Sequence, residues 1–174
     1  MAKQHHPLDA NRKALVMGND SYKAVTKLEN AREDARLMAK SLSNVGYQVT
    51  MKLDLTEKEM KAALRGFKNQ VEAGDEVAIF YAGHGVQIGG ASYLMPTDIQ
   101  LNNEQNVQLR AYPLRRLLDE VSAAPSAVNI VILDACRDNP FAEKASGKGL
   151  AQLDAPPGTY LAFATSPGNV AEDG

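Results

Sequence analysis

The chain has 174 residues, of which 44% are hydrophobic and 23% are charged, as is typical of one globular domain with its own core. Its net charge of −2 excludes a strongly basic surface for nucleic acid or an anionic membrane, and no apolar stretch approaches the ~20 residues of a membrane span. The single cysteine excludes an internal disulfide and a metal site built from several cysteines.

The start of the chain and its cysteine content bear on where the protein resides. Residues 1–12 are polar, contain no apolar signal-peptide core, and are expected to form a flexible N-terminal segment. One cysteine fits a reducing compartment, which favours a cytoplasmic location. An exported, periplasmic form is compatible with the same count, because exported proteins can also lack disulfides.

Apolar runs alternate with segments of helical periodicity along the chain. Short runs bounded by turn residues predict strands, and a capping box formed by Thr56 and Glu59 predicts the start of a helix. In chain order, the patterns predict a strand at 13–18, a helix at 28–45, a strand at 47–53, a helix at 56–71, a strand at 77–81, a helix at 113–122, and strands at 129–133 and 159–165.

This order of elements predicts an α/β fold, in which a parallel sheet is covered by helices on both faces. The longest connections are 83–106, with a small hairpin near 86–94, and 138–157. In sheets of this kind, ligands bind at the carboxyl ends of the strands. Residues that follow the apolar runs are therefore the strongest candidates for a functional site.

Two of those runs lead to a reactive side chain. The run at 77–81 leads to His84, which lies between two glycines, and the run at 129–133 leads to Cys136, which precedes a polar segment. A thiol and an imidazole at neighbouring strand ends supply a nucleophile and a base. Taken singly, Cys136 is more simply a small buried side chain, and His84 a loop residue. Their matching positions favour catalysis over both simpler interpretations.

The segments around both residues resemble the motifs of a known family. Tyr-Ala-Gly-His-Gly at 81–85 and Asp-Ala-Cys-Arg at 134–137 are similar to the His and Cys motifs of the caspase-like cysteine peptidases, in particular the bacterial metacaspase-like orthocaspases. Further similarity covers 14–19, Tyr22, 28–35 and 159–174. The resemblance implies a three-layer αβα sandwich with a mostly parallel central sheet, and a catalytic domain over 13–174.

The chemistry that this resemblance implies is a Cys–His dyad with no third residue. Cys136 would attack the scissile carbonyl, and His84 would pass the proton to the leaving amine. The backbone N–H groups of Gly85 and Cys136 would bind the developing oxyanion. No cofactor is required; calcium is expected only as an activator, and the sequence contains no acidic calcium-binding loop.

The resemblance also implies a specificity pocket. Caspases that cut after Asp carry a Gln at the position of Asp134, whereas metacaspases carry an Asp at the position of Asp34. Two carboxylates favour a Lys or Arg side chain, so cleavage is predicted after basic residues. Simpler interpretations are a solvated helix residue for Asp34 and a loop-orienting carboxylate for Asp134. Arg32 is an alternative partner that would neutralise Asp34.

Expected partners follow from the same resemblance. They are protein or peptide substrates with a basic residue before the cut, and neither nucleic acid nor a membrane. In the family, the sheet continues past 159–165 into a small C-terminal part, which this chain lacks and with which it is expected to associate. Lys144 and Lys148 lie in the connection 138–157 and are candidate self-cleavage sites for an enzyme of basic specificity.

Two functions of other classes compete with this prediction. A caspase-fold interaction or assembly module would keep the fold without turnover, but the intact His84 and Cys136 disfavour it. A cysteine-dependent hydrolase or transferase on a Rossmann-like sheet would leave Asp34, Asp134 and the His–Cys spacing unexplained. A cysteine endopeptidase is therefore the favoured function.

Overall fold

A computed structural model describes residues 11–137 and 153–164 of the chain. The candidate self-cleavage sites Lys144 and Lys148 lie outside the described residues.

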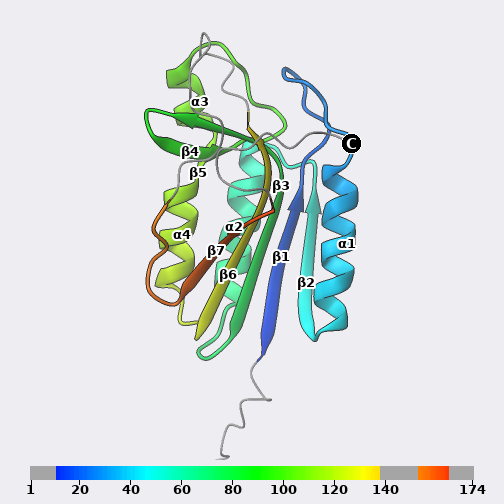
Figure 1. Cartoon of the computed structure of the whole chain (residues 1–174), viewed down its shortest axis with the longest axis vertical. Helices are drawn as coiled ribbons and strands as arrows, with labels where there is room; N and C mark the ends of the chain where they lie inside the picture. Colours follow the sequence, from blue (N-terminus) through cyan, green and yellow to red (C-terminus); the bar gives the residue numbers. More distant parts are fainter. Residues whose placement is uncertain (1–10, 138–152, 165–174) are drawn as a thin grey trace, which may run out of the picture.

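Strands and helices alternate along the chain (Figure 1). The strands are β1 (Arg12–Gly18), β2 (Tyr47–Leu53), β3 (Glu76–Ile88), β4 (Ala91–Leu94), β5 (Tyr112–Pro113), β6 (Val128–Arg137) and β7 (Thr159–Phe163). The helices are α1 (Ala31–Asn44), α2 (Glu57–Gln70), α3 (Glu104–Arg110) and α4 (Leu114–Ala123).

The central sheet is mostly parallel. Its main strands lie in the order β2-β1-β3-β6-β7, and each neighbouring pair in this order is parallel. Parallel strands need a crossover, and α1, α2 and α4 lie on the connections between successive strands of this set. At the carboxyl end of β3, residues 85–88 pair with the antiparallel strand β4, which pairs with β5.

Successive side chains of the strands point to opposite faces of the sheet, and the core is divided between these two faces. On one face, Leu15, Ile79 and Val131 pack in one cluster with buried side chains of α2 and α4. On the other face, Val16 and Phe80 pack with side chains of α1. Successive strand residues point to opposite faces, so strands buried on both faces are apolar throughout. This arrangement confirms the predicted α/β sandwich with helices on both faces.

Two strands extend further than their apolar runs predict. β3 continues from residue 81 to Ile88, and β6 continues from residue 133 to Arg137. β3 pairs with β6 through Gly85, and β4 then folds back against its last residues, so backbone partners are available along the whole extension. His84 and Cys136 therefore lie within paired strands, and the expectation that they follow the strand ends is wrong.

The helix boundaries show one further difference. α1 begins at Ala31 rather than at residue 28, because the N–H of Leu28 donates to the carbonyl oxygen of Asp20 and holds that stretch outside the helix. The capping box at Thr56 is confirmed, since its hydroxyl oxygen accepts the N–H of Glu59 at 3.3 Å. The seven-residue helix α3 was not predicted from periodicity, which is a weak signal over so short a span.

Candidate active site

His84 and Cys136 lie opposite each other on neighbouring strands. In the parallel register of β3 with β6, His84 is the partner of Cys136, and the next residue, Gly85, is the partner of Arg137. Neighbouring strands lie about 4.8 Å apart. Backbone register alone therefore brings the two positions together, although they are far apart in sequence.

The imidazole of His84 is held by a backbone carbonyl. Its Nε2 lies 2.7 Å from the carbonyl oxygen of Thr26, and its ring meets the Tyr22 ring edge-on, with the centroids 4.6 Å apart. A carbonyl oxygen can only accept a hydrogen bond, so Nε2 carries a proton. In the neutral ring, Nδ1 is then the basic nitrogen. Thr26 thus orients the ring and selects the tautomer that leaves Nδ1 free to accept a proton.

The segment that supplies this carbonyl, residues 19–30, is anchored by a buried carboxylate. Asp20 is only 3% exposed, and its two oxygens accept the N–H groups of Ala31 at 2.8 Å and of Arg32 at 3.0 Å. These are the first backbone donors of α1, whose own N-cap residue, Asn30, makes no side-chain hydrogen bond to them. Asp20 therefore ties the start of α1 to the segment beside His84.

Asp54 holds the same segment from the end of β2. Its Oδ1 accepts the N–H groups of Asp20 and Ser21, both at 2.9 Å, and Arg32 bridges the carboxylates of Asp20 and Asp54 at 3.2 Å each. Burial acts to raise the pKa of Asp54, but the two N–H groups and the Arg32 charge outweigh it, and the pKa is lowered. Arg32 is thus engaged by two carboxylates other than Asp34.

Asp34 and Asp134 lie together beside the two reactive positions. Burial raises the pKa of the half-buried Asp134, and the charge of Asp34 and a hydrogen bond with its side chain raise it further. Asp134 is two residues before Cys136 and pairs with Ala82, two residues before His84. The acidic pair therefore lies at the same end of the sheet as the thiol and imidazole positions.

Sequence and fold match one peptidase family. Residues 11–174 match the caspase domain family. The chain belongs to this family. Over 131 residues, or 75% of the chain, it is 30% identical to mucosa-associated lymphoid tissue lymphoma translocation protein 1 of Homo sapiens, and 30% identical over the same length to the homolog of Mus musculus. Its fold is similar to that of protein GSU0716 of Geobacter sulfurreducens, with a TM-score of 0.58 and 19% identity.

This caspase domain corresponds to only part of those proteins. The matched region is 16% of the human relative and 15% of the mouse relative. The structural match covers 72% of this chain and 50% of the Geobacter chain. The match assigns the domain to a family of cysteine peptidases.

Gly85, a predicted oxyanion-binding position, is part of β3. Gly85 is buried and lies between Arg137 of β6 and Leu94 of β4 in the sheet. Within residues 11–137 and 153–164, no three His, Cys, Asp or Glu side chains gather to hold a metal ion. The helices of the same residues include none long and apolar enough to cross a membrane.

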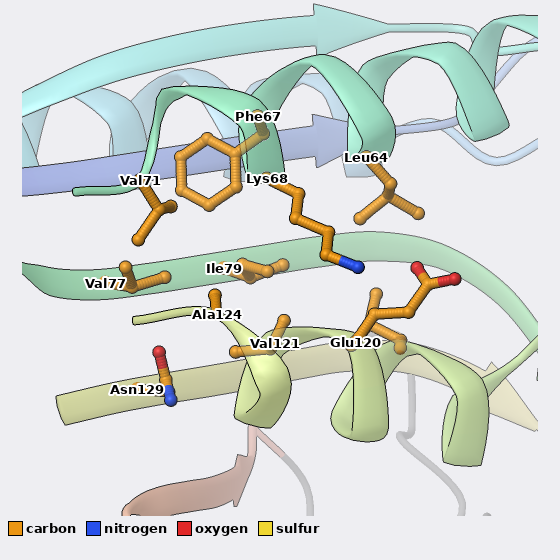
Figure 2. A pocket seen from close by; sticks show the side chains of 11 residues that line it. Leu64, Phe67, Lys68, Val71, Val77, Ile79, Glu120, Val121, Ala124 and Asn129 are labelled. Atoms are coloured by element: carbon orange, nitrogen blue, oxygen red, sulfur yellow. The ribbon is translucent and has the colours of Figure 1, made fainter. Parts of the chain in front are cut away.

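A crevice between α2 and α4 lies away from these residues (Figure 2). It has a cavity volume of about 20 Å³, and its walls are mostly apolar. They comprise Leu64, Phe67, Lys68, Val71, Val77, Ile79, Leu117, Glu120, Val121, Ala124 and Asn129. Ile79 precedes His84 by five residues of β3, roughly 17 Å along the strand. The crevice is thus a packing feature of the α2–α4 face, separate from the candidate active site.

Several supporting groups were not predicted from sequence. The carbonyl of Thr26 gives no sequence signal, because every residue has one. Asp20 does give a signal, since an acidic residue in a turn before a helix is a frequent capping group, but its partners start eleven positions later. The backbone carbonyl of Thr26 is thus an addition to the predicted pair of His84 and Cys136, whose catalytic roles stay predictions.

Proposed function

We propose that this caspase domain is a cysteine endopeptidase of the metacaspase type that cleaves after Arg or Lys. The observation that carries the proposal is the register of His84 with Cys136, combined with the Thr26 carbonyl that leaves Nδ1 of His84 as the basic nitrogen. A thiol needs such a base to become a nucleophile near neutral pH.

In the proposed reaction, Nδ1 of His84 accepts the thiol proton of Cys136, and the sulfur forms a bond to the scissile carbonyl carbon. The N–H groups of Gly85 and Cys136 donate to the oxygen as it becomes negatively charged. When the C–N bond breaks, His84 gives its proton to the leaving amine. A water molecule, deprotonated by His84, then hydrolyses the acyl-enzyme and restores the thiol.

Asp34 and Asp134 supply the proposed specificity. A substrate guanidinium or ammonium group that enters between the two carboxylates compensates their negative charges. The pairing of Arg32 with Asp20 and Asp54 supports this assignment, since it leaves Asp34 free of that cation. Arg is expected to be preferred to Lys, because its planar group can bond both carboxylates.

The test is hydrolysis of fluorogenic peptides that differ only in the residue before the cut: Arg, Lys or Asp. The full-length protein is expected to cleave after Arg and Lys and not after Asp, and the Cys136→Ala and His84→Ala variants are expected to cleave none. A preference for Asp would contradict the acidic pocket. If no peptide is cleaved by protein that folds normally, the non-catalytic interaction module becomes the better function.

The proposal includes completion by a small C-terminal part and self-cleavage at Lys144 or Lys148. In the described residues, β7 pairs only with β6, and its Tyr160 is 65% exposed, which supports further polypeptide packing at this edge. Following the intact mass of the full-length protein with time tests the cleavage. A cut after either lysine that is lost in Cys136→Ala supports it, whereas a cut that persists in this variant contradicts it.

A further inference from the structure

Two buried tyrosines enclose the main chain of His84. Tyr22, in the segment 19–30, is 1% exposed, and Tyr81, in β3, is 0% exposed. Their hydroxyl oxygens lie 3.2 Å apart. The hydroxyls meet directly beside His84, although Tyr22 and Tyr81 come from separate parts of the chain.

The two hydroxyls bond opposite sides of the His84 backbone. The N–H of His84 donates to the Tyr22 oxygen at 2.8 Å, and the Tyr81 hydroxyl donates to the carbonyl oxygen of His84 at 2.6 Å. Tyr22 gives its own proton to the carbonyl oxygen of Met95 at 3.0 Å, so each hydroxyl has a partner for its single proton. Both main-chain groups of His84 are therefore fixed by side chains from two elements.

Gly83 makes room for this arrangement. A Cβ atom at position 83 would lie 2.6 Å from the hydroxyl oxygen of Tyr81 and 2.8 Å from that of Tyr22, too close for either side chain to stay in place. The glycine before His84 thus permits the contact between the hydroxyls and the backbone.

The hydroxyls stay protonated over the range in which an imidazole titrates. Burial raises the pKa of Tyr22 to about 12, and burial also raises the pKa of Tyr81, with the neighbouring Tyr22 adding to the effect. Neither group takes part in proton transfer near neutral pH, so both act as neutral hydrogen-bonding groups.

We propose that Tyr22 and Tyr81 are positioning residues for His84, which hold its backbone so that Nδ1 meets the thiol of Cys136; this rests on the proposed function. The segment 19–30 reaches the histidine twice, through Thr26 at the ring and through Tyr22 at the backbone. Losing the Tyr22 hydroxyl leaves a buried N–H group of His84 without its acceptor and releases one side of the residue. The expected result is a displaced imidazole rather than a lost substrate contact.

The test compares Tyr22→Phe and Tyr81→Phe with Tyr112→Phe in the full-length protein. Tyr112 is a matched control, because it is also buried (4% exposed) and its hydroxyl bonds Glu120 of α4 rather than the backbone of His84. We expect kcat for an Arg peptide to fall roughly 10- to 100-fold in Tyr22→Phe and Tyr81→Phe, with KM within about twofold of wild type. Tyr112→Phe is expected to keep the wild-type kcat, even if its melting temperature falls as much as that of Tyr22→Phe or Tyr81→Phe.

A second measurement separates this inference from the proposed function. The rate at which iodoacetamide alkylates Cys136 is recorded against pH for wild type, His84→Ala and Tyr22→Phe. If no peptide is cleaved but wild type alkylates faster near neutral pH than both variants, the peptidase assignment fails and the positioning role stands. If Tyr22→Phe keeps the wild-type kcat or alkylation profile, or Tyr112→Phe loses as much kcat, the positioning role is overturned. Identical profiles in all three proteins overturn both.

Discussion

Two regions of the molecule are held in different ways. Around the main chain and imidazole of His84, buried polar groups with fixed partners, such as Asp20 and Tyr22, surround the candidate active site. Between α2 and α4, the packing is apolar and leaves a crevice (Figure 2). Hydrogen bonds are directional, whereas apolar packing stabilises without fixing one orientation. The comparison implies that the apolar packing between α2 and α4 supplies stability and that the polar groups around His84 supply the geometry of the site.

Removing a large side chain from the crevice should have the greatest effect on stability. Phe67→Ala deletes a buried ring that lines the crevice, and we expect the free energy of unfolding to fall by about 3–5 kcal/mol. Because Phe67 is remote from His84, kcat per folded molecule should stay unchanged. Chemical denaturation and active-site titration measure the two quantities. A loss of kcat beyond the loss of folded protein would contradict the separation of stability, supplied between α2 and α4, from the geometry of the site.

A change among the polar groups around His84 should lower activity as well as stability. Asp20→Ala leaves the N–H groups of Ala31 and Arg32 without their acceptor, and we expect a loss of about 2–4 kcal/mol together with a lower kcat. The matched control is Glu33→Ala, whose exposed ion pair with Arg36 at 3.5 Å should contribute less than about 0.5 kcal/mol. Equal losses in both variants, or an unchanged kcat in Asp20→Ala, would argue against a supporting role for Asp20.

Apolar packing could be predicted from the sequence better than the hydrogen bonds around His84. Apolar periodicity predicts the strands and helices, because burial is encoded by side-chain type. The extension of β3 through His84 was not predicted, since Gly-His-Gly resembles a turn and only pairing with β4 and β6 makes it a strand. The Thr26 carbonyl and the Tyr22–Tyr81 contact depend on tertiary placement, which single-sequence patterns do not contain.

Asp134→Asn tests the acidic pair of Asp34 and Asp134, and we expect an effect on KM of intermediate size. An amide keeps a donor for Asp34 but removes a charge, so KM for Arg peptides should rise roughly 10- to 100-fold, as for loss of a close charge pair. Peptide kinetics with Arg and with an uncharged residue before the cut measure the effect. An equal rise in KM for both peptides would contradict a charge-based pocket.

The raised pKa of Asp134 predicts the direction in which stability and KM change with pH. The raised pKa of Asp134 means that the folded protein holds a proton more tightly than the unfolded chain, so stability falls as pH rises from the ordinary Asp range through the raised value. Asp134→Asn should therefore be more stable than wild type at neutral pH. KM of the wild type for Arg peptides should decrease as pH rises through the same window. A KM that is flat across this window, or a variant less stable at neutral pH, would contradict the raised pKa of Asp134.

The smallest effect is expected from filling the crevice. Ala124 lines it and has an extended backbone (φ −71°, ψ 153°) that a β-branched residue adopts readily, so Ala124→Val should raise the free energy of unfolding by about 0.5–1 kcal/mol. Activity should not change. Thermal denaturation measures the gain, and a destabilised variant would show that the crevice has no space for two further methyl groups.

The central claim is that Cys136 is a His84-activated nucleophile beside a pocket for basic side chains. Reaction of the full-length protein with an arginyl chloromethylketone tests both parts, with the labelled residue located by mass spectrometry. We expect rapid labelling of Cys136, slow labelling in His84→Ala and Asp134→Asn, and none in Cys136→Ala. Folded wild-type protein that is not labelled at Cys136, or is labelled equally fast by an aspartyl reagent, would contradict the account.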